Sequence, residues 1–447
     1  MLFGNQVTNN SGFKKYLSNT SWLFAEKIFR IAIGLFITVW LARYLGPEQF
    51  GIFNYALSFV AIFGVLSSLG LDKLVTKELL SHPQDSHEIM GTSFTLRFIG
   101  AILLLPLAAF SISIVRPEND LVFIMVIIIS SAFFFTSFEV IKYWFESHVQ
   151  AKYSAIIDAI VIFTSSTIKG VLIILEAPLI AFAWVVLIES ILLATGLIII
   201  YIQKSNKISD WKVSFVKVKY LLKEAYPLIL SGAVFVLFTR IDQVMLGSMI
   251  GDEAVGVYAA AVRISEGWMF IPAIIATSLF PAMLNARKNN YTLYLQRTQH
   301  LLNLMAVLGV SVAIGVIFIA SPFMNLIFGE SYSQSSSILI IHIWGMVFNA
   351  ISIISFRYFL AEGLQIYSFY RAFAGLILNI ALNYLLIPIY GAVGAAVATA
   401  ISQGVAVWLL NSISPKTRIM FFMQAKALSL YWSLNTLKHI KSLRAGK

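Results

Sequence analysis

The chain reads as a series of long apolar runs separated by short polar stretches. Of its 447 residues, 59% are hydrophobic and only 12% are charged. Each run holds about 20 mostly apolar residues, enough for one α-helix to cross roughly 30 Å of hydrocarbon. The short alternating segments of a membrane β-barrel are absent, so helical spans are expected. The pattern predicts an all-α polytopic membrane protein with twelve transmembrane helices, at about 22–44, 48–70, 91–115, 121–145, 153–175, 178–202, 225–249, 253–281, 300–321, 336–360, 367–388 and 391–412.

The charged residues predict an orientation. The chain carries 32 Lys and Arg against 21 Asp and Glu, a net charge of +11. The basic residues gather in alternate loops and at the C-terminal end, and an excess of Lys and Arg is typical of cytoplasmic segments. We therefore expect both termini on the cytoplasmic side, and we expect no nucleic-acid partner, since membrane orientation accounts for the positive charge.

Basic segments also predict the domain organisation. The longest basic loop lies between the sixth and seventh spans, and a basic amphipathic tail follows the twelfth. Such a tail suits the anionic inner leaflet of a membrane. The expected parts are a cytoplasmic N-terminus (1–21), a six-helix bundle (22–202), a basic cytoplasmic linker (203–224), a second six-helix bundle (225–412) and the amphipathic cytoplasmic tail (413–447).

A hairpin is repeated in the two halves of the chain. The stretch LARYLGPEQFGIFNYAL in the first half matches MLGSMIGDEAVGVYAAAV in the second at a constant shift of 205 residues. This shift spans six helices, an even number, so both halves share one orientation across the membrane. They are then related by a pseudo-two-fold axis along the membrane normal, which suits transport by alternating access. The matching positions include Gly46 with Gly251, Glu48 with Glu253 and Gly51 with Gly256.

The residues of this hairpin predict a tight turn between helices. Gly46 is suited to end a helix in a left-handed conformation, and Pro47 to begin the next one. Glu48 then lies in the first helical turn, where the helix dipole favours an anion. We expect Gly51 to remove bulk where the two helices of its own hairpin approach each other. The motif is interpreted as architecture rather than as a binding site.

Three stretches carry a resemblance to a known family. The sequences LARYLGPEQFGIFNYALSF, TRIDQVMLGSMIGDEAVGVYAAAVRISE and IPIYGAVGAAVATAISQ resemble the polysaccharide-exporter branch of the multidrug/oligosaccharidyl-lipid/polysaccharide (MOP) exporter superfamily, and within it the Wzx-type flippases of O-antigen repeat units. The resemblance covers residues 12–410. It implies a MATE-like fold in the bacterial inner membrane and movement of an undecaprenyl-pyrophosphate-linked oligosaccharide from the cytoplasmic to the periplasmic leaflet. It also implies contacts with the polymerase and chain-length regulator of the same pathway. We expect a monomer.

Basic side chains inside the spans are the candidate substrate-binding residues. A pyrophosphate crossing the membrane needs a wet cavity lined by cations, and the planar fork of arginine binds two phosphate oxygens at once. Local ion pairing is the structural alternative, through Glu26 with Arg30 or Arg263 with Glu266. Three further arginines near span ends, Arg97, Arg357 and Arg371, are expected to extend toward lipid headgroups. The four candidates for the substrate are Arg30, Lys169, Arg240 and Arg263.

Acidic side chains inside the spans are candidates for coupling to an ion gradient. A carboxylate in a span is costly unless it is protonated, binds a cation or forms an ion pair. Glu189 has no local partner in the sequence, whereas cross-span ion pairs for any of these acids stay an open alternative. The candidates for binding H⁺ or Na⁺ are Asp158, Glu189, Asp242 and Glu266.

No catalytic signature accompanies these residues. The chain has no cysteine, and its six histidines show no metal-binding spacing, so we expect neither a metal site nor a cofactor. A phosphate-binding glycine loop is missing, which argues against ATP as the direct driver. Two alternatives remain: a multidrug or small-cation antiporter of the same superfamily, and a membrane glycan polymerase or ligase. The second is disfavoured because the outer connections are short.

Overall fold

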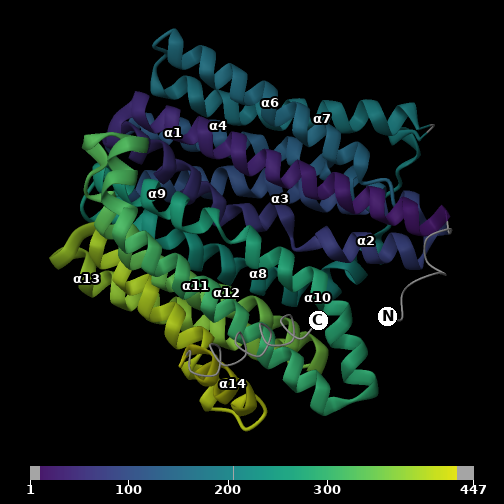
Figure 1. The fold of residues 1–447 in the computed structure, drawn as a ribbon. Helices are drawn as coiled ribbons and strands as arrows, with labels where there is room; N and C mark the ends of the chain where they lie inside the picture. Colours follow the sequence, from purple (N-terminus) through teal and green to yellow (C-terminus); the bar gives the residue numbers. More distant parts are fainter. Residues whose placement is uncertain (1–10, 205, 430–447) are drawn as a thin grey trace. The chain divides into compact units, whose positions relative to one another are not determined.

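The regular secondary structure of the described residues consists of α- and 3-10 helices. The computed structural model of the chain describes residues 11–204 and 206–429, with side chains from residue 29 onward (Figure 1). The α-helices are α1 (Ser11–Ser68), α2 (Leu71–Ser81), α3 (Ser86–Val115), α4 (Asp120–Thr136), α5 (Val140–Ser147), α6 (Lys152–Ile174), α7 (Leu179–Gln203), α8 (Phe215–Met249), α9 (Asp252–Gly267), α10 (Phe270–Asn289), α11 (Tyr291–Phe328), α12 (Ser335–Glu362), α13 (Gln365–Val407) and α14 (Arg418–Leu428). Five 3-10 turns join them in the described ranges: η1 (Pro83–Asp85), η2 (Ser137–Glu139), η3 (Ile208–Asp210), η4 (Glu330–Tyr332) and η5 (Leu409–Ser412).

The described helices include ten segments that are long and apolar enough to cross a membrane. Each of the twelve predicted spans overlaps one of these segments. Two segments each overlap two predicted spans, because α1 runs through Gly46 and α13 through Gly391, two glycines whose backbone is not helical. The all-α prediction is therefore confirmed, while the count of twelve spans stays a prediction.

Two compact units divide the chain. Unit 1 comprises Met1–Leu45 and Ile52–Val236, and unit 2 comprises Gly46–Gly51 and Leu237–Lys447. A buried apolar cluster from α2, α3, α5, α6 and α7 forms a core of unit 1. A second cluster, mainly from α10, α11, α12 and α14, forms a core of unit 2. The predicted division at 203–224 stays a prediction.

Much of the predicted basic linker packs onto unit 1. Helix α8 already begins at Phe215, inside the segment predicted as a loop. Lys217 Nζ lies 2.7 Å from Asp85 Oδ2, and the Tyr220 hydroxyl donates to Glu78 Oε1 at 3.0 Å. These contacts fix the first turns of α8 against α2 and η1. Of the predicted amphipathic tail (413–447), residues 413–429 are described and include α14, and the rest lies outside the described residues.

The two repeated glycines lie at the predicted turns with a positive φ, but their ψ is extended and not that of a left-handed helical cap. Gly46 has φ 70° and ψ 172°, and Gly251 has φ 112° and ψ 177°. Positive φ is accessible to glycine without steric cost. In each copy the next helix starts directly afterwards, at Pro47 and at Asp252.

The predicted reason for Gly51 is wrong in one respect. A Cβ placed on Gly51 would collide with the backbone carbonyl oxygen of Asp252, and a Cβ on Gly256 would collide with that of Pro47. All four residues belong to unit 2. The glycines therefore remove bulk between the two repeated hairpins, and not between the helices of one hairpin. We call this reciprocal backbone approach the glycine contact.

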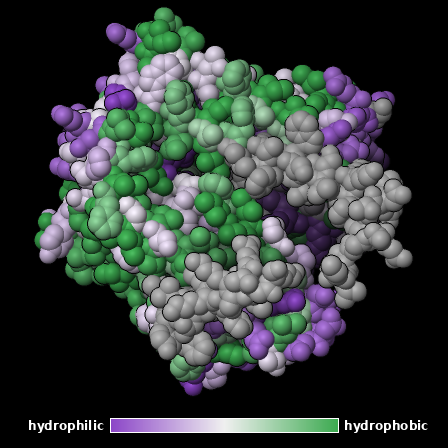
Figure 2. Space-filling model, in the orientation of Figure 1, coloured by the Kyte–Doolittle hydropathy of each residue, from purple (hydrophilic) through white to green (hydrophobic). Residues whose placement is uncertain are grey.

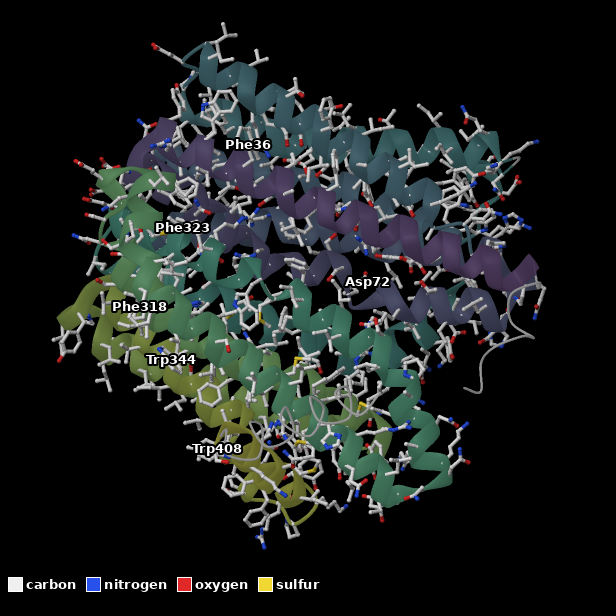
Figure 3. The ribbon with its side chains drawn as sticks, viewed as in Figure 1. Phe36, Asp72, Phe318, Phe323, Trp344 and Trp408 are labelled. Atoms are coloured by element: carbon white, nitrogen blue, oxygen red, sulfur yellow. The ribbon has the colours of Figure 1, made fainter. Side chains whose placement is uncertain are left out.

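Large apolar side chains cover much of the outside. Hydrophobic residues dominate the face seen in Figure 2. The side chains labelled in Figure 3 include Phe36 of unit 1, which is 68% exposed, and Phe318 of unit 2, which is 78% exposed. Exposure of this kind suits contact with lipid, since water would disfavour it. Together with the ten apolar segments, it indicates a multi-pass membrane protein.

Candidate functional site

One carboxylate is fully enclosed in unit 2. Asp242 of α8 is 3% exposed, and its Oδ2 atom accepts hydrogen bonds from the hydroxyls of Tyr258 on α9, at 2.6 Å, and Thr399 on α13. The Nδ2 atom of Asn383 on α13 donates to Oδ1 at 2.6 Å. All three partners are neutral. A buried carboxylate held only by neutral groups is stabilised further when it takes up a proton or a cation.

A second amide side chain of α13, that of Asn379, adjoins these groups. Asn379 and Asn383 are four residues apart, so they lie on one face of the helix. Asn383 Nδ2 also donates to Asn379 Oδ1 at 3.2 Å, while Asn383 Oδ1 is buried without a hydrogen-bond partner. Carboxylate, amide and hydroxyl oxygens are the ligands that hard cations prefer. We call Asp242, Tyr258, Asn379, Asn383 and Thr399 the Asp242 cluster.

Three charged candidates of unit 2 keep exposed side chains. Arg240 of α8 and both Arg263 and Glu266 of α9 are exposed. Arg240 and Arg263 each interact electrostatically with Glu266. Arg240 is exposed and Asp242 is buried, so these near neighbours on α8 have different surroundings. The group carries two positive charges and one negative charge, a surplus that favours an anion.

Two candidates of unit 1, Arg30 and Asp158, lie in a chain of ion pairs. Arg30 Nη2 of α1 lies 3.4 Å from Asp158 Oδ2 of α6, and Lys142 Nζ of α5 lies 2.7 Å from Asp158 Oδ1. Lys142 also approaches Glu139 Oε1 of η2 at 3.8 Å. From Glu139 the chain passes to Arg97 of α3, at 2.9 Å. Charges of alternating sign thus join five elements of unit 1.

Arg97 is the most enclosed member of this chain. Its side chain is 3% exposed, and besides Glu139 it contacts Asp72 of α2 at 3.2 Å, the Tyr143 hydroxyl at 2.8 Å and the Thr136 carbonyl oxygen at 3.0 Å. Asp72 is labelled on its helix in Figure 3. The prediction that Arg97 extends toward lipid headgroups is wrong, because tertiary contacts on three sides bury it.

Replacing Arg97 by methionine is expected to destabilise the protein by about 2–4 kcal/mol, because two carboxylates lose their common cation. Thermal unfolding of the detergent-purified protein measures this. Arg287→Met is the control: Arg287 also pairs with one carboxylate, Glu362 at 2.8 Å, but is 41% exposed. An exposed pair contributes at most about 1 kcal/mol. Equal losses in the two variants contradict a structural role for Arg97.

Two other sequence expectations have an outcome in the structure. For Glu189 of α7 the cross-span ion pair that was left open is observed, since its Oε2 lies 3.5 Å from Lys169 Nζ on α6. Arg371 is 9% exposed and donates to Asn411 Oδ1 at 3.0 Å, so its predicted approach to headgroups is also wrong. The predicted pair of Glu26 with Arg30 falls on a side chain outside the described ones. For Arg357 the headgroup prediction stays a prediction.

Sequence reasoning missed the neutral members of the Asp242 cluster and Lys142. Asn379 and Asn383 carried a usable signal, two amides at helical spacing inside an apolar run. Lys142 carries no comparable signal, because it lies near the end of a predicted span. Among the side chains of residues 29–204 and 206–429, no three His, Cys, Asp or Glu residues are grouped closely enough to hold a metal ion.

Known proteins share the sequence pattern and the fold. A sequence model of the family described as "Polysaccharide biosynthesis protein" matches residues 16–287, and the MatE model matches residues 227–385. A putative O-antigen transporter of Shigella flexneri is 26% identical over 417 residues, covering 86% of this chain and 94% of the relative. A probable low-salt glycan biosynthesis flippase of Haloferax volcanii is 22% identical over 395 residues, covering 86% of this chain and 80% of the relative.

Two solved structures resemble the chain over most of its length. The lipid II flippase MurJ, in an inward closed conformation, superposes with a TM-score of 0.72 at 17% identity, covering 93% of this chain and 95% of that one. An inward-facing MATE multidrug transporter of the MOP superfamily superposes with a TM-score of 0.69 at 13% identity, covering 90% and 95%. The fold is therefore the MOP fold, as predicted.

Proposed function

The chain belongs to the polysaccharide biosynthesis protein family, and from this premise we propose that it is a flippase for lipid-linked oligosaccharides. It moves a repeat unit on undecaprenyl pyrophosphate from the cytoplasmic to the periplasmic leaflet of a bacterial inner membrane, with both termini in the cytoplasm. The observation that carries the proposal is the family match, supported by the O-antigen transporter and glycan flippase among the relatives. This is transport, and it requires no covalent step on the substrate.

The pyrophosphate is the part of the substrate that the charged residues recognise. Arg240 and Arg263 of unit 2 outnumber Glu266, and both are exposed. Arg30 of unit 1 is 48% exposed, and Lys169 is paired with Glu189. Arginine binds two phosphate oxygens through its planar fork, so the arginines provide the stronger contacts. Lys169 contributes less, because its carboxylate partner already neutralises it.

An ion gradient drives the cycle through the Asp242 cluster. Asp242 is enclosed by neutral hydrogen-bond partners and by the buried, unpartnered Oδ1 atom of Asn383. Binding of Na⁺ or H⁺ neutralises the carboxylate and changes the hydrogen bonds between α8, α9 and α13. Asp158 and Glu189 are weaker coupling candidates, since basic partners already balance them.

A leaflet assay tests the proposed function. Purified protein is placed in liposomes that contain fluorescent undecaprenyl-pyrophosphate oligosaccharide, and the wild type is compared with Arg240→Ala and Arg240→Lys at matched protein levels. We expect the wild type to move the lipid, the alanine variant to lose most of the rate, and the lysine variant to recover part of it, because lysine keeps the charge but not the fork. If all three variants flip equally, Arg240 does not bind the headgroup.

The same liposomes separate the flippase from a drug antiporter. A wild type that moves no lipid but exports a cationic dye under an ion gradient contradicts the proposed function. Such a result assigns the chain to the antiporter alternative.

A further inference from the structure

Asp158 is clasped by two cations from two different helices. We propose that Arg30 and Lys142 form a binding site for the substrate's pyrophosphate, that the Asp158 carboxylate occupies this site in the absence of substrate, and that the headgroup binds by displacing it. Lys142 is then a second headgroup-binding residue, and Asp158 sets the affinity by competition. This inference rests on the proposed function and deepens it.

The geometry gives Asp158 one oxygen for each cation. Lys142 Nζ contacts Oδ1 at 2.7 Å, and Arg30 Nη2 approaches Oδ2 at 3.4 Å. One small carboxylate therefore spans the two basic groups, as a bridging anion would. The arrangement differs from a simple tie between two residues, since α1, α5 and α6 all meet at Asp158.

Exposure shows which groups a ligand reaches. The side chain of Arg30 is 48% exposed, that of Lys142 is 17% exposed and that of Asp158 is 14% exposed. An anion arriving from solvent meets Arg30 first and Lys142 next, with the carboxylate between them. By contrast, Arg97 further along the chain is 3% exposed and keeps the carboxylate partners of its own. Arg97 therefore stays structural while Arg30 and Lys142 are reachable.

Pyrophosphate is the better ligand for such a pair. It offers several charged oxygens on two phosphorus centres, so it binds the arginine fork through two oxygens and reaches the lysine with another. Asp158 offers one oxygen to each cation and has none left over. The exchange leaves Lys142 with Glu139 at 3.8 Å as a remaining neighbour, so the lysine stays anchored while its main partner changes.

If Asp158 competes with the ligand, two substitutions are expected to change the affinity for pyrophosphate in opposite directions. Removing the competing charge in Asp158→Asn is expected to tighten binding, because the carboxylate no longer competes with the ligand for Arg30 and Lys142. Removing the second cation in Lys142→Gln is expected to weaken it. A charge-assisted hydrogen bond contributes about 1.5–3 kcal/mol, so each change is expected to be about tenfold or more. A merely structural ion pair predicts no tightening in either variant.

The test uses the full-length protein in detergent with inorganic pyrophosphate as the probe. Calorimetry measures the dissociation constant for the wild type, Asp158→Asn, Lys142→Gln and the control Lys217→Gln. Lys217 is 20% exposed, close to the 17% of Lys142, and pairs with Asp85 of the same unit at 2.7 Å, but it lies outside this chain of ion pairs. We expect the order Asp158→Asn tighter than wild type, wild type equal to Lys217→Gln, and Lys142→Gln weakest.

Other outcomes overturn the inference. It fails if Asp158→Asn binds pyrophosphate no more tightly than the wild type at an unchanged melting temperature. It also fails if Lys142→Gln binds as the wild type does, a result that stands even when Asp158→Asn does not fold. Equal affinity for orthophosphate and pyrophosphate contradicts the bridging geometry.

The leaflet assay keeps this failure apart from failure of the proposed function. If the four proteins show the expected order of affinities but the wild type flips no lipid, the anion site is supported and the proposed flippase function is contradicted. If the wild type flips lipid but all variants bind pyrophosphate alike, the proposed flippase function is supported and the role of Asp158 is contradicted.

Discussion

Valine at Gly51 or at Gly256 is expected to lower the free energy of unfolding by about 3 kcal/mol or more, the upper range of overpacking costs. At both positions a Cβ collides with backbone atoms, at Asp252 and at Pro47, so no side-chain rotation relieves the clash. The helical segments must separate instead, and the contacts around them are lost. Thermal unfolding and the yield of monodisperse protein in detergent measure the effect.

A third glycine provides the control. Gly315 lies in α11, and a Cβ added there meets no atom within 4 Å. Gly315→Val is expected to change stability by less than about 1 kcal/mol, because valine is at least as good a helix former as glycine. The double variant of Gly51 and Gly256 is expected to cost less than the two single losses added, since one separation relieves both clashes. Fully additive losses contradict the glycine contact.

Asp242→Asn is expected to abolish ion-driven transport and to leave much of the folded protein intact. Asparagine has the shape of aspartate and still accepts a hydrogen bond, but it neither carries the charge nor exchanges a proton. Lipid movement in liposomes is then expected to fall to the rate of protein-free vesicles under a Na⁺ or H⁺ gradient. Binding of inorganic pyrophosphate is expected to be unchanged, since Asp242 lies buried and touches only neutral groups.

The matched control for this variant is Asp252→Asn. Asp252 begins α9 and is partly exposed, so the same chemical change there weakens a favourable interaction with the helix dipole. We expect transport by Asp252→Asn to stay close to that of the wild type. If Asp242→Asn still responds to the gradient, coupling takes place elsewhere, and Glu266 becomes the next residue to replace.

Local chemistry explains which features the sequence predicts. The turns at Gly46 and Gly251 depend on neighbouring residues only, and the sequence predicts both turns and the positive φ of Gly46. The partner of Gly51 was not, because its contact with Gly256 joins segments 205 residues apart. A repeat shows that two segments are alike, but not that they touch.

The polar sites show the same limit. Asp242 stood out as a charge within an apolar run, whereas Asn383 and Thr399 reach it from 141 and 157 residues away. Glu189 seemed unpaired because its partner Lys169 lies on another helix. Residue type and depth in a span identify candidates, but helix packing decides whether a charge is exposed, paired or enclosed.

The glycine contact also restricts how the gene can change. Every single-base substitution that alters a glycine codon without stopping translation introduces a residue with a Cβ, and a Cβ is what neither Gly51 nor Gly256 has room for. The two copies of the hairpin differ elsewhere, as at Pro47 and Asp252. A change at Gly51 or Gly256 costs packing in either copy, so we expect the repeat to persist at these two positions while the surrounding sequence varies.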